Sequence, residues 1–195
     1  MPNSAASAAA ASTERRRQLA PIARAALAAL LVAACAPAER ESSTVDIRSD
    51  QFSKVITLAG PAARSYSGVS VRYLLRSFVT KDAPPRVSHQ IFAEFFYTGP
   101  VKHYELASDD GAQPLDLLRI EAHTCLQQDC TKSEAIAVDV ADETLRRRAQ
   151  TGYSVKVTAR SGDASILTIT PLMIAKQLDA VAGVIGGTTS TNEAR

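Results

Sequence analysis

Alternation of apolar and polar residues between positions 87 and 97 is the feature that most restricts how this chain can fold. In VSHQIFAEFFY the odd-numbered positions from Val87 to Tyr97 are mostly apolar, and Gln90 and Glu94 lie between them. Successive side chains of a β-strand point to opposite faces, so this period of two predicts a strand, with His89 and Gln90 on opposite sides. Residues 69–76 alternate in the same way. The middle of the chain is therefore expected to be sheet.

Shorter segments of the same kind recur along the chain. They cover residues 55–58, 102–107, 115–124, 134–140, 153–160 and 164–170. Asp109-Asp110-Gly111 and Ser161-Gly162-Asp163 lie between such segments and are typical of tight turns that join hairpin strands. Together with the two longer segments, these give about eight predicted strands.

Two segments are expected to be helical. DETLRRRA, residues 142–149, has acids in its first turn and arginines in its last, which suits the helix dipole, and Gly152 follows its end. Pro171 can open a second helix, in which one face consists of Leu172, Ala175, Leu178 and Ala182. We expect one mainly β domain over residues 54–183, an antiparallel sandwich or curved sheet with the C-terminal helix packed on it. An α+β arrangement is the alternative.

Charge is unevenly distributed. The chain has 195 residues with 22 Lys+Arg and 20 Asp+Glu, but residues 1–34 contain four arginines and one glutamate. The remainder therefore has 18 basic and 19 acidic residues, without the basic excess that nucleic-acid binding requires. Five Phe, five Tyr and no Trp also leave few rings on which bases could stack. We expect no nucleic-acid partner.

The N-terminal region predicts export. AALAALLVAA, residues 25–34, is apolar on all sides but supplies only half of the roughly 20 residues that a spanning helix needs. It follows the basic segment RRRQLAPIAR and ends in small residues. This order is typical of a secretory signal peptide, here residues 1–34. A buried core helix behind an unstructured arm is the alternative.

The end of this segment resembles the lipobox of bacterial lipoproteins, an aliphatic and two small residues before a cysteine: Val32-Ala33-Ala34-Cys35. The resemblance implies cleavage before Cys35, a diacylglycerol on its thiol and, usually, a further acyl chain such as palmitate on its amine. Two or three acyl chains anchor a protein stably to a membrane. Ala36, in place of the Asp that retains lipoproteins at the inner membrane, resembles the outer-membrane pattern. Arg16-Arg17-Gln18-Leu19 leaves a twin-arginine export route open.

The segments on either side of the domain lack periodic patterns. Residues 35–53 read as the lipidated cysteine and a flexible tether, and residues 184–195 as a disordered tail.

The other two cysteines are Cys125 and Cys130, separated by four residues between two predicted strands. In an oxidising periplasm such a pair predicts a disulfide at the neck of a hairpin loop. Two alternatives have weaker support. Redox-active pairs are usually Cys-x-x-Cys at a helix N-terminus, and a zinc site would need two ligands beyond these cysteines, for which only His123 is close by.

No local motif indicates catalysis. The chain lacks the strings that mark zinc peptidases, α/β-hydrolases and Ser-x-x-Lys enzymes. His89, His103 and His123 all lie on predicted strands, and a Ser/His/Asp set assembled across strands stays open, because such triads are defined by geometry. Structural or surface histidines are the default expectation, with no catalytic residue, cofactor or metal assigned.

Two clusters could serve a partner. Phe92 and Phe96 fall on one strand face and Phe95 and Tyr97 on the other, so one pair lies outside the core unless both faces are covered. Residues 146–148 are three consecutive arginines, which point in different directions on a helix and are expected to be a solvated helix end.

Several segments, in order, resemble a group of uncharacterised Gram-negative periplasmic lipoproteins: RYLLRSFVTKD, VSHQIFAEFFYTG, the cysteine hairpin with EAIAVDVADETL, GYSVKVTARSG and TPLMIAKQLDAV. The resemblance covers residues 69–181 and implies a lipid-anchored, periplasm-facing β domain with a Cys-x4-Cys hairpin, without an assigned activity. We expect an envelope protein with a binding, accessory or structural role and an envelope protein as partner. An envelope hydrolase built around a strand histidine and a thiol-disulfide protein using Cys125 and Cys130 are the alternatives.

Overall fold

The computed structural model describes residues 44–123 and 130–192, with side chains as far as Gly187. Cys35 and Cys125 lie outside these residues, so lipidation and the disulfide stay predictions. The described strands are β1 (Asp46–Ser49), β2 (Val55–Ala59), β3 (Ala63–Tyr66), β4 (Ser70–Thr80), β5 (Val87–Tyr97), β6 (Tyr104–Asp109), β7 (Pro114–Leu115), β8 (Leu117–His123), β9 (Lys132–Val140), β10 (Tyr153–Ala159) and β11 (Ala164–Ile169). The helices are α1 (Asp142–Arg147) and α2 (Pro171–Asn192).

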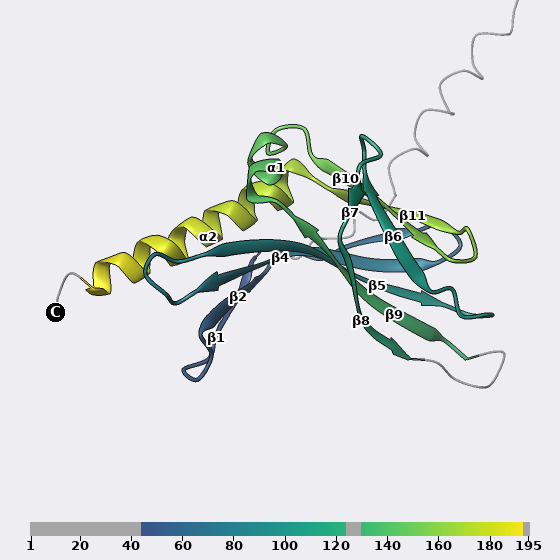
Figure 1. The fold of residues 1–195 in the computed structure, drawn as a ribbon, viewed down its shortest axis with the longest axis horizontal. Coiled ribbons are helices and arrows are strands. Elements are labelled where there is room, and N and C mark those ends of the chain that lie inside the picture. Colours follow the sequence, from purple (N-terminus) through teal and green to yellow (C-terminus); the bar gives the residue numbers. More distant parts are fainter. Residues whose placement is uncertain (1–43, 124–129, 193–195) are drawn as a thin grey trace, which may run out of the picture. The chain divides into compact units, whose positions relative to one another are not determined.

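Seven strands form the larger sheet, in the order β1-β2-β4-β5-β9-β8, with β3 also paired to β4 (Figure 1). All of its pairs are antiparallel. At its centre, β4 and β5 run side by side from Ser70 opposite Phe96 to Val79 opposite Val87. The alternation in both segments is confirmed, because their odd-numbered side chains face the core and the even-numbered ones face away.

Four strands form the smaller sheet, in the order β11-β10-β6-β7. The two turn sequences predicted from glycine and aspartate close its hairpins, and Gly162 in the second adopts a φ of 91° that favours glycine. The chain passes from β7 into β8, and so from one sheet to the other, through the single residue Asp116.

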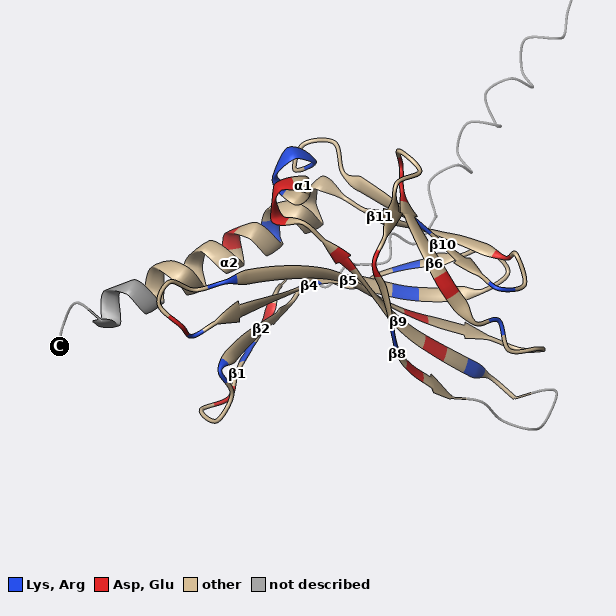
Figure 2. Ribbon diagram, viewed as in Figure 1, with Lys and Arg blue, Asp and Glu red and all other residues tan. Residues whose placement is uncertain are grey.

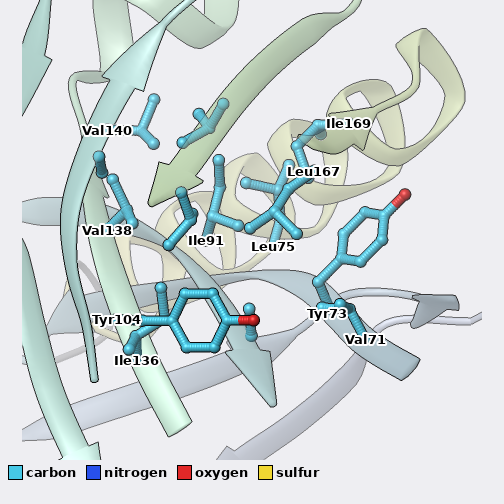
Figure 3. Packing of buried hydrophobic residues seen from close by; sticks show 14 of the residues in the cluster. Val71, Tyr73, Leu75, Ile91, Tyr104, Ile136, Val138, Val140, Leu167 and Ile169 are labelled. Atoms are coloured by element: carbon cyan, nitrogen blue, oxygen red, sulfur yellow. The ribbon is translucent and has the colours of Figure 1, made fainter. Parts of the chain in front are cut away.

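The main hydrophobic core lies between the two sheets. Side chains of β4, β5 and β9 meet those of β11, and Tyr73 donates a hydrogen bond across the interface to the Thr168 carbonyl at 3.3 Å (Figure 3). Phe95 stacks on Tyr104 with 3.8 Å between ring centroids. The expected fold class is confirmed: the protein is mainly β, with two packed antiparallel sheets and a C-terminal helix against the strands.

Helix α2 packs on the larger sheet with a different face from the one expected. Its buried residues are Met173, Ile174, Gln177 and Val181. Of the expected face, Leu178 is half-buried against the core, whereas Leu172 is 53% exposed. Ala175 and Ala182 are also exposed. The apolar stripe is interrupted by a buried glutamine, and this interruption made the neighbouring apolar face look like the packed one.

Two boundary predictions were wrong. Strand β1 lies within the expected tether, residues 35–53, and α2 continues through most of the expected disordered tail, residues 184–195. All four residues of β1 are exposed, and the alternation of Val45 and Ile47 with Asp46 and Arg48 is too short to predict a strand. In α2, Val184 and Ile185 pack against a second cluster formed by Ile56, Leu58, Val79 and Val181. The described part of the chain has eleven strands, whereas about eight were predicted. The additional strands β1, β3 and β7 are too short to give a periodic signal.

Candidate functional site

The side of the larger sheet that faces away from the core forms the candidate site, here called the solvent face. It consists of the outward residues of the central strands, arranged in rows that cross the sheet. One row contains Leu74, Phe92, Ala137 and Leu118, which are directly opposite one another on β4, β5, β9 and β8. The next row contains Arg76, Gln90 and Asp139. A third contains Thr57, Phe78 and Ser88.

The first row is apolar in a position where polar residues are expected. The solvated side of an antiparallel sheet normally carries polar side chains, which gives strands their alternation. Leu74 and Ala137 of this row are buried, with 8% and 1% exposure, and Phe92 is half-buried, while Leu118 is 60% exposed. Phe96 lies on the same side of β5 and is 37% exposed. Phe95 and Tyr97 pack in the core, whereas Phe92 is half-buried and Phe96 is exposed on the other side of β5.

The second row holds an arginine in a fixed position. The Gln90 side-chain oxygen accepts hydrogen bonds from Arg76 Nε at 2.9 Å and Nη2 at 2.7 Å, and the Gln90 amide donates to Asp139 at 2.7 Å. The rings of Phe78 and Phe92 lie 5.3 and 4.8 Å from the guanidinium carbon, within the range of cation–π attraction. Burial lowers the pKa of Arg76, and the Asp139 charge opposes that effect.

A pocket of about 300 Å³ opens at the end of this face. It is lined by Val55, Phe78, Thr80, Arg86, Val87 and Ser88. Phe78 occupies the row between Arg76 and Thr80, so the arginine and the pocket are neighbours along β4. Arg86 already contacts Asp82 at 3.3 Å, and its side chain is largely exposed.

Acidic and basic residues are interspersed over the strands (Figure 2), and most arginines of the solvent face have a carboxylate partner. Arg72 pairs with Glu94 at 2.8 Å and Arg48 with Asp46 at 2.7 Å. Arg76 differs because, within the described residues, it contacts a carboxylate only through Gln90.

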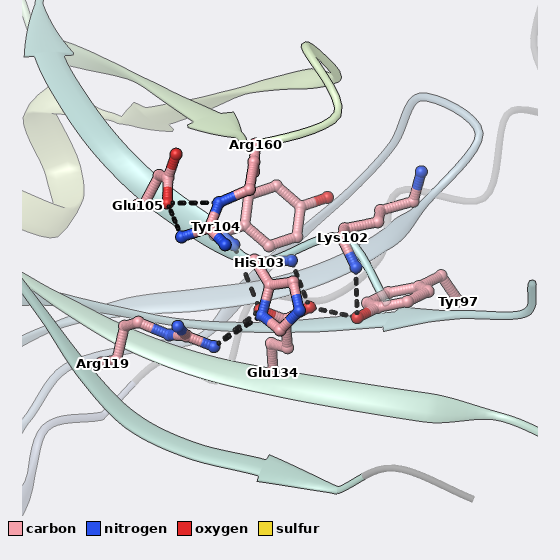
Figure 4. A network of polar contacts seen from close by, with 8 residues as sticks. All are labelled: Tyr97, Lys102, His103, Tyr104, Glu105, Arg119, Glu134 and Arg160. Atoms are coloured by element: carbon pink, nitrogen blue, oxygen red, sulfur yellow. Dashed lines mark hydrogen bonds and ion pairs between the residues drawn. The ribbon is translucent and has the colours of Figure 1, made fainter. Parts of the chain in front are cut away.

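A buried carboxylate organises the opposite side of the sheet. Glu134 accepts hydrogen bonds from the Tyr97 hydroxyl and from the backbone amides of His103, at 2.9 Å, and Tyr104, at 3.1 Å (Figure 4). Burial would raise the pKa of Glu134, but these bonds and the nearby Arg119 charge outweigh it and lower that pKa. Burial, followed by the bond to Glu134, raises the pKa of Tyr97 to about 12.

These bonds explain the backbone of the connection between β5 and β6. His103 has a φ of 57°, a left-handed conformation that residues with a side chain rarely adopt. Arg119 donates to its Nδ1 at 3.1 Å, so that ring nitrogen serves as an acceptor. The Glu134 carboxylate accepts hydrogen bonds from groups of the protein itself. We therefore assign Glu134 and His103 a structural role, which is to hold the connection from β5 to β6 between the two sheets.

A buried polar cluster around His89 lies under α2. His89 Nδ1 is 2.7 Å from the Ser77 hydroxyl, and its Nε2 is 3.0 Å from Asp142 at the start of α1. Gln177 donates to the same hydroxyl at 2.7 Å and to the Leu58 carbonyl at 3.1 Å. Because the Asp142 carboxylate can only accept, His89 Nε2 donates to it, and in the neutral ring Nδ1 accepts the hydrogen bond of the Ser77 hydroxyl.

A serine, a histidine and an aspartate are thus joined in one hydrogen-bonded chain, but the arrangement is a structural one. Ser77 is fully buried and its oxygen is already bonded by Gln177, so a substrate carbonyl has no path to it. The chain links β2, β4, β5, α1 and α2. Burial of hydrogen-bonded polar groups of this kind fixes a unique packing.

The remaining predicted residues lie apart from these groups. His123 is exposed and contacts Glu121 at 2.8 Å. Arg146, Arg147 and Arg148 pair with three different carboxylates, as a solvated helix end would. Cys130 directly follows the undescribed residues that contain Cys125. Across residues 44–123 and 130–192, no three His, Cys, Asp or Glu side chains come together as metal ligands.

Sequence reasoning did not single out the residues that define the solvent face and the buried chain. Arg76 and Gln90 were placed on the outward side by alternation, but nothing local marks Arg76 as stacked between two rings. A polar residue in an apolar helical stripe was the available signal for Gln177.

None of the described helices is both long enough and apolar enough to cross a bilayer. Comparisons with models of protein families, with curated proteins and with solved structures found no match for this chain. The fold and the site therefore have to be interpreted from their own geometry.

Proposed function

We propose that this protein is a lipid-anchored binding domain of the bacterial cell envelope. In this proposal Cys35 carries the lipid, the domain faces the periplasm, and the solvent face of the larger sheet contacts a partner. The observation that carries the proposal is the apolar row Leu74, Phe92, Ala137 and Leu118 beside a stacked arginine. Aromatic residues and arginine are the residue types that contribute most to binding at protein interfaces.

Binding is favoured over catalysis because the reactive groups of the described chain have other partners. Ser77, His89 and Asp142 bond to one another beneath α2, and Glu134 bonds to backbone amides. The solvent face, by contrast, exposes the apolar side chains of Leu118 and Phe96. The envelope hydrolase is therefore the less supported alternative.

Site-specific photo-crosslinking in cells tests the binding face. A benzophenone side chain at Leu118 should give a discrete crosslinked product, because Leu118 is 60% exposed on the proposed contact surface. The matched control is Leu106, which is 63% exposed on the smaller sheet and should give none. Equal products from both positions, or none from position 118, would contradict the proposal.

Metabolic labelling with an alkyne analogue of palmitate tests the anchor. The wild-type protein should incorporate the label and fractionate with membranes, and Cys35→Ala should do neither. Cys130→Ala is the control, since removing a cysteine of the folded domain should leave labelling unchanged. Labelling that persists in Cys35→Ala would refute lipidation at this cysteine.

A further inference from the structure

We infer that the solvent face binds a free single-chain anionic amphiphile, with its carboxylate on Arg76 and its alkyl chain in the neighbouring pocket. This inference rests on the proposed binding function and names a ligand class for the same face. Four features carry it: the fixed guanidinium, its unused edge, the apolar pocket and the spacing between them.

Arg76 is held in place before any ligand arrives. Gln90 bonds the edge formed by Nε and Nη2, and the rings of Phe78 and Phe92 lie against the guanidinium plane. A side chain fixed in this way loses little further freedom on binding, so each new hydrogen bond is gained at low entropic expense.

The other edge of the guanidinium is available. Within the described residues Nη1 has no acceptor, and Nη2 uses one of its two hydrogens on Gln90. Two parallel N–H groups at the end of an arginine match the two oxygens of a carboxylate. Arg76 is a half-buried cation, and its contact with the Asp139 carboxylate runs only through Gln90. Its free edge is therefore complementary to an anionic head group.

The pocket suits the apolar part of the same molecule. Val55, Phe78 and Val87 form its apolar wall, and Thr80 lies four residues beyond Arg76 on β4. Four residues of strand span about 13 Å, which sets the reach required of the alkyl chain. A medium-length chain meets this requirement, whereas a bare anion or a very short acid leaves the pocket empty.

Titration of the purified full-length chain carrying Cys35→Ala, without detergent, tests the inference. Isothermal calorimetry with hexanoate, octanoate and decanoate should show affinity rising by up to about fourfold for each methylene that enters the pocket. Decyl trimethylammonium, which has the same chain and the opposite charge, should bind far more weakly. Equal binding of the two decyl compounds would overturn the role of Arg76.

Arginine variants provide the matched control. Arg76→Gln should weaken decanoate binding by about 10-fold to 100-fold, the loss of a charge-assisted pair of hydrogen bonds. Arg160→Gln changes an arginine at the end of β10 in the smaller sheet, which already pairs with Glu105 at 2.8 Å, and should weaken it less than threefold. Both variants should keep the urea midpoint of the parent. An equal loss in both would overturn the assignment.

The remaining outcomes separate this inference from the proposed function. If decanoate fails to bind while position 118 still crosslinks in cells, the ligand class is wrong and the binding face stands. If the chain binds phosphatidylglycerol vesicles but not decanoate, a membrane surface replaces the free amphiphile and the inference fails. If neither decanoate nor a crosslinked partner is found, both proposals fail.

Discussion

The buried chain through Ser77 gives the sharpest prediction about stability. Removing its hydroxyl by Ser77→Ala leaves one N–H of Gln177 and the Nδ1 of His89 without their partner at 2.7 Å. Each buried polar group left unsatisfied costs about 1–3 kcal/mol. Because both groups are deeply buried and α2 covers them, we expect Ser77→Ala to lower the free energy of unfolding by about 2–5 kcal/mol.

Urea unfolding followed by circular dichroism measures this loss. Ser88→Ala is the matched control, because Ser88 is an exposed serine on the neighbouring strand and should change stability by less than about 0.5 kcal/mol. A second test uses the pair. In the Ser77→Ala background Gln177 already lacks a partner, so adding Gln177→Leu should be at least about 1 kcal/mol less destabilising than the same change in the wild type.

Two results would refute the reasoning. Surface substitutions usually change the free energy of unfolding by no more than about 0.5 kcal/mol. If Ser77→Ala changed it by no more than that, the hydroxyl would not be an obligatory hydrogen-bond partner. Strict additivity of Ser77→Ala and Gln177→Leu would mean that the two side chains act independently, in conflict with the 2.7 Å contact between them.

Other predictions follow from the same structure. The pKa of Glu134 is lowered in the folded protein, so its contribution to stability is complete above the ordinary value of 4.5 and is lost as the pH falls through the lower folded value. Urea midpoints measured between pH 6 and 2 should show this loss. Glu134→Gln should make the midpoint depend less on pH and should lower the free energy of unfolding at pH 7 by about 2–4 kcal/mol. Gly60→Ala should destabilise by about 1–3 kcal/mol, because its Cβ would lie 2.7 Å from the Gln177 side-chain oxygen and 3.0 Å from the Leu75 carbonyl. Gly183→Ala, in an open part of α2, should instead stabilise by about 0.5–1 kcal/mol, and urea unfolding measures both glycine variants. Mass spectrometry of the unreduced protein should find a Cys125–Cys130 peptide 2 Da lighter than its reduced form, and free thiols at both positions would contradict the disulfide.

The β-rich fold could be predicted because its long strands are half-buried. In β4 and β5 each odd-numbered residue meets the core, so the pattern of burial appears directly in the order of residues. The hairpins of the smaller sheet were equally accessible, since Gly162 and Asp109 are the residues that such turns need. These are local signals, and they survive in a single sequence.

The errors occurred where burial is absent or polar. Strand β1 is held by backbone pairing to β2 and exposes every side chain, and the alternation around it covers too few residues to predict a strand. The packed face of α2 contains Gln177, whose amide nitrogen donates to the Leu58 carbonyl and the Ser77 hydroxyl, on strands far away in sequence. A side chain that is buried because distant groups accept its hydrogen bonds cannot be recognised from its own neighbours.

The same distinction explains why the candidate site was only half visible. Alternation placed Arg76 and Gln90 on the outward side, but their importance depends on the register of three strands, which sets Gln90 opposite both Arg76 and Asp139. His89, one of the three histidines considered for a catalytic set, is instead hydrogen-bonded in the interior to Ser77 and Asp142. The inner side of the larger sheet uses its polar groups to fix the fold, and the described solvent face keeps one oriented arginine edge free. Because the two sides of the sheet differ in this way, binding through the solvent face is a better supported interpretation than catalysis.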